Sequence, residues 1–143
     1  MQFNYEMQVH GSWNAASART AKLLDIAVRK AAFDIEANAK QPPIPVDTGA
    51  MRASIHVVTS KDNGHTKAVA DAKRLRKGVK TYPVVKPAGP REAIVAVGVH
   101  YGIYVEMGTR KMTGRPYLGP AIRRVTPAFR RACAQAIAKG ARP

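Results

Sequence analysis

The sequence predicts an α+β fold in which two long helices, one near each end of the chain, flank a small antiparallel sheet. Three observations support this prediction. Residues 15–40 are rich in alanine and lack glycine and proline, residues 54–60 and 93–99 are rich in β-branched side chains, and residues 116–139 show helical periodicity. The chain of 143 residues has the length of one domain, so we expect residues 1–143 to form a single unit.

The first predicted helix, Ala15–Lys40, carries apolar residues at the three- and four-residue spacing of one helix face. These residues are Leu24, Val28, Ala31 and Ile35. Asn14 and Ser12 are candidates for its N-terminal cap. Pro42 and Pro43 prevent the helix from continuing, because proline lacks a backbone N–H and clashes with the preceding turn.

A short helical turn is expected after the two prolines, within the segment PVDTGAMRASI at residues 45–55. Asp47 and Thr48 can accept the free backbone N–H groups of a turn that runs from Gly49 to Arg52. This role gives Asp47 a structural purpose and requires no chemical reaction.

Two β-branched runs predict the strands of the sheet, and we expect them to pair. The first, Ser54–Ser60, contains Ile55, Val57, Val58 and Thr59, and the second, Ala93–Val99, places Val95, Val97 and Val99 on one face. Tyr101–Met107 has the composition of a third strand or a continuation of the second, ended by Gly108. Thr81–Val85 is predicted as a short edge strand, since Pro83 is tolerated only at a sheet edge.

A long basic insertion loop is expected between the strands, at residues 61–91, which hold nine basic and two acidic side chains with several glycines and prolines. Structureless segments of this length are usually functional or disordered. The densest run contains Lys73, Arg74, Arg76, Lys77 and Lys80. It favours contact with DNA phosphates or with an acidic neighbouring protein, and a solvated loop is an equal alternative. Tyr82 alone follows the run, so base stacking is poorly supported.

The last predicted helix, at residues 116–139, is amphipathic and basic. Its apolar stripe consists of Leu118, Ile122, Val125, Phe129, Cys133 and Ile137, and its arginines Arg123, Arg124, Arg130 and Arg131 lie off that stripe. Pro127 is expected to kink the helix or restart it, with Thr126 as the new cap. Cys133 is expected to be a buried structural thiol.

The net charge of +15 favours polyanions or acidic protein surfaces as partners. The charge is concentrated in residues 61–91 and in residues 110–143, and the second of these segments contains nine basic side chains and no acidic one. Two contact surfaces are therefore expected, with a solvated basic face as the alternative. No apolar run approaches the roughly 18 residues of a membrane span, and the first residues lack the pattern of a signal peptide. Synthesis in the cytoplasm without membrane contact is therefore expected.

The sequence offers no catalytic cluster, metal site or cofactor motif. The four histidines are scattered without metal-ligand spacing, and no nucleophile motif or phosphate-binding loop is present, so an enzyme is not expected. Glu106 is the acidic residue of most interest, because it lies between apolar neighbours. We expect it to pair with Arg52, Arg110 or Arg115, either within the chain or across a subunit interface.

Three segments in a fixed order resemble one protein family. They are P-V-D-T-G-x-x-R-x-S-I at residues 45–55, Y-x-x-x-V-E-x-G-T at residues 101–109 and R-P-Y-L-x-P-A at residues 115–121, followed by a helical end. Together they resemble the tail-component, or tail-completion, family of lambda-like long-tailed bacteriophages. The insertion at residues 61–91 is longer and more basic than this family requires.

The resemblance implies a structural virion protein that works by surface complementarity and catalyses no reaction. It implies a homo-oligomeric ring, usually of six-fold symmetry, at the head–tail neck or the top of the tail, assembled in the host cytoplasm. The implied partners are neighbouring neck proteins and the tail-tube or tail-terminator protein. Packaged DNA is a further candidate partner. A tail terminator or head-closure subunit, and a basic nucleic-acid-binding protein of a prophage, are the alternatives.

Overall fold

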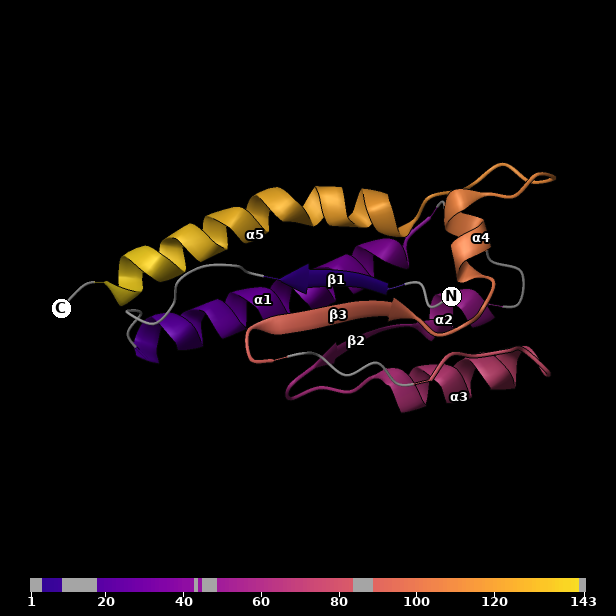
Figure 1. Cartoon of the computed structure of the whole chain (residues 1–143), viewed down its shortest axis with the longest axis horizontal. Coiled ribbons are helices and arrows are strands. Elements are labelled where there is room, and N and C mark those ends of the chain that lie inside the picture. Colours follow the sequence, from indigo (N-terminus) through magenta and orange to yellow (C-terminus); the bar gives the residue numbers. More distant parts are fainter. Residues whose placement is uncertain (1–3, 9–17, 43, 45–48, 84–88, 142–143) are drawn as a thin grey trace.

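The computed structural model describes residues 4–8, 18–42, 44, 49–83 and 89–141, and it confirms the predicted α+β class (Figure 1). Long helices near both ends of the chain accompany an antiparallel sheet. The elements in chain order are β1 Asn4–Gln8, α1 Ala18–Ala39, α2 Ala50–Ser54, β2 Ile55–Thr59, α3 His65–Leu75, β3 Glu92–Val97, α4 Gly102–Met107 and α5 Leu118–Gly140.

The sheet has the strand order β1-β3-β2, and both pairings are antiparallel. The predicted pairing of the two β-branched runs is confirmed, with Val57 opposite Val95. The sequence did not predict β1, which places Tyr5 opposite Val95 on the other edge of β3. Because successive strand residues point to opposite faces, the burial of almost every residue in β2 and β3 shows that both faces of this part of the sheet are covered.

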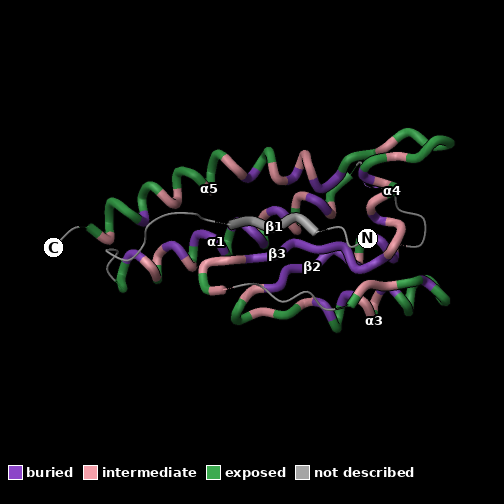
Figure 2. The backbone as a smooth tube through the Cα atoms, in the orientation of Figure 1, coloured by how far each residue is buried: buried purple, intermediate pink, exposed green. Residues whose placement is uncertain are grey.

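The helices cover the sheet and one another. Figure 1 shows α5 running along α1, and α1 packs against β2 and β3, whereas α3 contacts α2 and β2. The buried residues form one cluster in which α1, the sheet and the first half of α5 meet (Figure 2). Its members include Val28, Ile35, Ile55, Val57, Val95, Val97, Leu118 and Val125.

The predicted loop at residues 61–91 is wrong in its first half, because residues 65–75 form the helix α3. The buried side chains of this helix, His65, Ala68 and Ala72, follow the three- and four-residue spacing of one helix face. Its exposed positions are mainly alanine, lysine and arginine, which favour helix. The basic residues therefore lie on the surface of an ordered helix and of the turn after it.

The predicted third strand at residues 101–107 is also wrong, because residues 102–107 form the helix α4. The two buried residues of this helix, Gly102 and Glu106, are four positions apart and share one face. A methyl group at Gly102 would lie 2.6 Å from Val97 Cγ1, so the absence of a side chain allows α4 to pack closely on the end of β3. Tertiary packing therefore overrides the strand propensity of the aromatic and β-branched residues.

The predicted helix at residues 116–139 is confirmed as α5, but it neither restarts nor takes a new cap at Pro127. The Thr126 hydroxyl donates to the Ile122 carbonyl oxygen at 2.7 Å, one helical turn back. Cys133 is half-buried rather than buried, and this burial raises the pKa of its thiol. Ile137 is exposed, so the predicted apolar stripe is covered only in its first part.

The predicted helix caps and the predicted edge strand involve residues that the structure does not describe. The proposed caps Asn14, Ser12, Asp47 and Thr48 lie outside them. Thr81 forms an isolated bridge with Val99, which is consistent with a short edge segment there, but Val84 and Val85 lie outside the described residues. Within the described ranges, no helix has the length and apolar character required to cross a membrane.

Candidate partner-binding surface

The structure brings basic residues from both charged segments of the sequence to one end of the molecule. The side chains of Lys73, Arg74, Arg76, Lys77 and Lys80 are exposed on the last turns of α3 and the turn that follows. This turn is bound to the start of α4, because the His100 N–H donates to the Lys80 carbonyl oxygen at 3.0 Å. The Arg76 guanidinium carbon also lies 5.1 Å from the centre of the Tyr101 ring.

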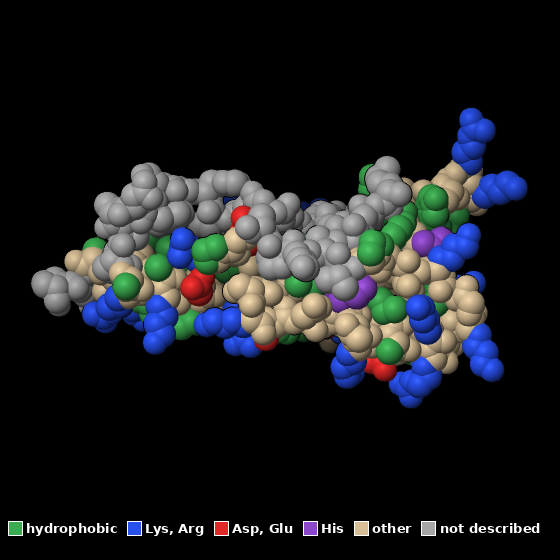
Figure 3. All heavy atoms as spheres, turned by 60° about the horizontal axis from the view of Figure 1, so that its bottom comes forward, with side chains coloured by type: hydrophobic (Ala, Val, Ile, Leu, Met, Phe, Trp, Pro, Cys, Tyr) green, Lys and Arg blue, Asp and Glu red, His purple; other side chains and the backbone are tan. Residues whose placement is uncertain are grey.

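The loop between α4 and α5 contributes the remaining cations at this end, which we call the cationic end. In Figure 1 the loop and the last turn of α3 project from the same side, and Figure 3 shows lysine and arginine side chains crowded there. The cationic end consists of Lys73, Arg74, Arg76, Lys77, Lys80, Arg110, Lys111 and Arg115. Three cations of the second charged segment thus lie at the same end as the first segment, whereas Arg123, Arg124, Arg130, Arg131 and Lys139 lie on α5. The expectation of two contact surfaces stays a prediction.

Little negative charge offsets this end. Among the described residues of α3 and α4, the carboxylates belong to Asp71 and Glu106. Asp71 is paired with Lys67 at 2.9 Å and lies 3.6 Å from Arg74, and Glu106 is buried. Like charges held close together on a rigid surface repel one another, which raises the electrostatic free energy of the unbound protein. A partner with negative charge would reduce this repulsion on binding.

Glu106 caps the last helix from a distance. Its Oε2 accepts the backbone N–H of Tyr117 at 2.7 Å and of Leu118 at 3.0 Å, and its Oε1 accepts that of Gly119 at 2.9 Å. These N–H groups have no partner within α5 because they belong to its first turn. The carboxylate also lies at the positive end of the helix dipole.

The expected arginine partner of Glu106 is not found within the described residues of the chain, and a pair across a subunit interface stays a prediction. Within the described part of the chain, no ion pair joins Glu106 to Arg52, Arg110 or Arg115. Arg52 is exposed on α2, and Arg115 is exposed with its backbone N–H donating to the Val105 carbonyl oxygen at 2.7 Å. A buried carboxylate that already holds three N–H groups needs no cation.

The loop between α4 and α5 is a tight hairpin, not an open coil. Gly108 and Thr113 form an antiparallel bridge, and the Thr109 N–H donates to the Met112 carbonyl oxygen at 2.8 Å. At Gly108, where φ is 84°, a methyl group would lie only 2.6 Å from the backbone nitrogen of Gly114. The two glycines therefore allow the two arms of the hairpin to touch.

Large apolar side chains are exposed on this hairpin and on the adjoining face of α4. Tyr104 is 52% exposed, Met107 is 72% exposed and Met112 is 43% exposed. Tyr104 and Met107 are three positions apart, so they share a face of α4. We call Tyr104, Met107 and residues 108–113 the tip. Apolar side chains that a chain of this size leaves in water, and that are surrounded by charge, are typical of a contact surface.

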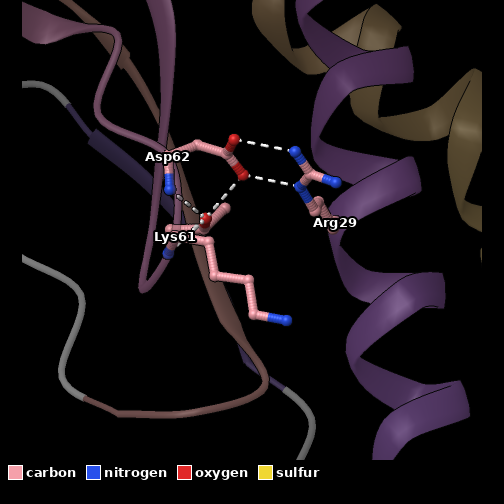
Figure 4. A network of polar contacts seen from close by, with 4 residues as sticks. Arg29, Lys61 and Asp62 are labelled. Atoms are coloured by element: carbon pink, nitrogen blue, oxygen red, sulfur yellow. Dashed lines mark hydrogen bonds and ion pairs between the residues drawn. The ribbon is translucent and has the colours of Figure 1, made fainter.

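The beginning of the basic segment is fixed to α1. Figure 4 shows Asp62 reaching across to Arg29, with hydrogen bonds of 2.6 and 2.8 Å from the guanidinium nitrogens to the carboxylate. Asp62 also accepts from the Thr59 hydroxyl at 2.9 Å. The Arg29 contact is the main reason why the pKa of Asp62 lies below its usual value. The ordered start of the segment means that α3 is presented in one position.

A buried pair of histidines joins α3 to β2. His56 Nδ1 lies 2.8 Å from the Ser54 carbonyl oxygen, which can only accept, so Nδ1 carries the proton and Nε2 is the free acceptor. His65 Nδ1 lies 3.3 Å from that Nε2 and donates to it. Burial is the main cause that lowers the pKa of both rings, so both are neutral in the folded protein near pH 7.

We expect the stability of the protein to fall as the pH drops through about 6.5, the value at which unfolded histidines protonate. The unfolded chain then binds protons that the folded pair does not, at a cost of up to about 1.4 kcal/mol per pH unit for each ring. Urea unfolding midpoints between about pH 5.5 and 8, a range chosen to lie above the titration of carboxylates, measure this. The double variant His56→Asn/His65→Asn should lose the dependence, and His100→Gln should keep it; equal slopes in all three proteins would contradict the assignment.

Among the described residues, no group of three or more histidine, cysteine, aspartate or glutamate side chains is placed to hold a metal ion. A groove bounded by α1, β2 and α3 is lined by apolar, polar and charged residues. Four of the charged ones form ion pairs with one another, Lys40 with Glu36 and Lys67 with Asp71. The most distinctive features of the molecule are therefore the cationic end and its tip.

Comparison with known proteins gave one match. The family described as "Bacteriophage HK97-gp10, putative tail-component" matches residues 12–108, which is more than half of the chain. The matched region contains α1, the sheet strands β2 and β3, the basic helix α3 and all of α4. No curated protein and no solved structure matched.

Proposed function

The chain belongs to the HK97-gp10-like family of bacteriophage tail components, and from this premise we propose that it forms an oligomeric ring at the head–tail neck or the top of the tail. In this role it completes the tail or joins it to the head, as a tail-completion, tail-terminator or head-closure subunit. Its partners are further copies of itself, in a ring proposed to be six-fold, and the neighbouring neck, tail-tube or tail-terminator proteins. The mature location is the virion.

The observation that carries this proposal is the cationic end, together with the apolar side chains around it. A ring subunit needs surfaces for its copies and surfaces for the proteins above and below it. Large exposed apolar residues occur away from the cationic end as well, namely Ile26 and Phe33 on α1 and Ile137 on α5. These positions supply separate candidate surfaces for contact between copies.

A nucleic-acid-binding role remains the second candidate, because exposed cations also attract phosphates. Base stacking on Tyr82 is not favoured, since its ring is only half-exposed and its hydroxyl lies 3.4 Å from the His100 carbonyl oxygen. We favour a protein partner for Lys73, Arg74, Arg76, Lys77 and Lys80, because a DNA channel lined with strong cations would retard the DNA that passes through it.

The purified chain is expected to have the mass of a closed ring, and replacing Lys73, Arg74, Arg76 and Lys77 with glutamine should leave that mass unchanged while reducing head–tail joining. Glutamine removes the charges but keeps helix propensity. Light scattering measures the ring, and electron microscopy counts joined particles. The matched control replaces Arg123, Arg124, Arg130 and Arg131 of α5 with glutamine and should join normally.

Three results would count against the proposal. A chain that is monomeric both alone and in assembled particles excludes the ring. Equal losses of joining in the α3 variant and its α5 control would indicate a general effect of net charge. Normal joining combined with weaker binding to duplex DNA would favour the nucleic-acid role, in which each phosphate contact removed lowers the slope of affinity against salt by about 0.9.

A further inference from the structure

We propose that the tip docks onto an acidic, partly apolar surface of a neighbouring virion protein that is not another copy of this chain. This inference rests on the proposed function and assigns one contact within it. The positive charge of the cationic end attracts the acidic partner. The tip, formed by Tyr104, Met107 and residues 108–113, makes the specific contact with it.

The composition of the tip fits a protein partner better than a phosphate backbone. Met107 and Met112 add flexible apolar area next to the charges of Arg110 and Lys111, and Tyr104 adds an aromatic ring. Phosphate contacts require cations but gain nothing from exposed methionines, whereas methionine, tyrosine and arginine are enriched where proteins bind one another. The tip therefore matches an apolar patch bordered by carboxylates.

The tip is also held in one shape before any partner arrives. Arg110 and Lys111 are the central residues of a turn in which Thr109 and Met112 exchange backbone hydrogen bonds of 2.8 and 3.4 Å. The bridge from Gly108 to Thr113 closes the hairpin below that turn. A preorganised hairpin loses little conformational entropy on docking, so most of its contact energy remains available for affinity.

A second copy of this chain offers little free negative charge to such a tip. Of the carboxylates whose side chains the structure describes, Asp34, Glu36, Asp62 and Asp71 are each paired with a cation of their own chain, and Glu106 is buried at the start of α5. Within the described residues, Asp25 and Glu92 form no ion pair, and both are partly buried. We therefore assign the acidic residues that would border the tip to a different protein.

The test uses extracts of phage particles that lack this chain, to which the purified full-length protein is added. Two tip variants are compared with wild type: Met107→Ser/Met112→Ser, and Arg110→Ser/Lys111→Ser. Both sites are exposed, so thermal unfolding should be unchanged. The control is Arg123→Ser/Arg124→Ser on α5, which removes two exposed cations outside the tip.

Each tip variant is expected to keep the ring mass of wild type and to lower the fraction of joined particles about tenfold or more, as the loss of a central interface residue does. The Arg110/Lys111 variant should also make the rate of joining less dependent on salt, because the steering charges are gone. The α5 control should join as wild type does.

Four results would overturn the inference. Loss of ring mass in the tip variants would make the tip a contact between copies. Normal joining in both tip variants would exclude a docking role, and normal joining with weaker binding to a duplex DNA probe would assign the tip to nucleic acid. If the wild-type chain itself forms no ring and restores no joining, the proposed function fails together with this inference.

Discussion

Glu106→Ala should lower the free energy of unfolding by on the order of 3 kcal/mol. The substitution leaves the N–H groups of Tyr117, Leu118 and Gly119 without the carboxylate that accepts them, in a place where little water reaches. Hydrogen bonds to a charged group are the stronger kind, and orphaned buried donors carry their full desolvation cost. Urea unfolding followed by circular dichroism measures the loss.

Two further variants show whether the capping geometry is the cause. Glu106→Gln keeps one acceptor oxygen but places an amide NH₂ against the helix donors, so it should lose a smaller part of the stability. Asp34→Ala removes an exposed carboxylate whose partner is Lys30 one helical turn back, and it should cost about 0.5 kcal/mol or less. If Glu106→Ala unfolds at the same urea concentration as wild type, the capping role is wrong.

Gly108→Ala is expected to have a comparably large effect, about 3 kcal/mol or more, because it combines two penalties. The backbone at Gly108 has φ 84° and ψ 175°, a region that is essentially restricted to glycine. The new methyl group would also lie 2.6 Å from the nitrogen of Gly114 and 2.9 Å from the Met112 carbonyl oxygen, so the hairpin would have to open.

Gly78→Ala separates these two penalties. Gly78 also has a positive φ, of 76°, but a methyl group there would meet nothing within 4 Å. This variant should therefore show the backbone strain alone, about 1 kcal/mol. Thermal unfolding of both variants gives the comparison, and equal losses of stability would mean that the close approach inside the hairpin contributes nothing.

The parts of the fold that the sequence predicted are those with a long or regular pattern. The apolar spacing of Leu24, Val28 and Ile35 persists over several turns, so α1 was found, and α5 was found for the same reason. The strands β2 and β3 were found because their β-branched runs are bounded by polar or turn-forming residues. The strand β1 was missed because it is short and its pairing partner lies far along the chain.

The missed helices show where local composition misleads. In α3, the density of lysine and arginine drew attention to charge, although His65, Ala68 and Ala72 already had the spacing of a buried helix face. In α4, strand-favouring residues surround Gly102 and Glu106, whose four-residue spacing is the helical signal. Short helices of this kind depend on tertiary packing more than on propensity.

The capping role of Glu106 had a signal in the sequence that was not used. The start of the last predicted helix, around Pro116 and Tyr117, has no serine, threonine, aspartate or asparagine at the capping position. The free N–H groups of its first turn must then find an acceptor elsewhere in the chain. Glu106 is the nearest upstream acid, and its carboxylate can accept these N–H groups as readily as it can pair with an arginine.

The strand order of the sheet also bears on how the protein is made. The central strand, β3, is the last of the three to be synthesised, and α5 adds its core residues later still. Neither β1 nor β2 has its sheet partner until residue 97 has left the ribosome, so the native contacts are separated by long stretches of chain. Such a topology is expected to fold slowly and only near the end of translation. The surfaces described above are consequently expected to form only after β3 and α5 have been synthesised.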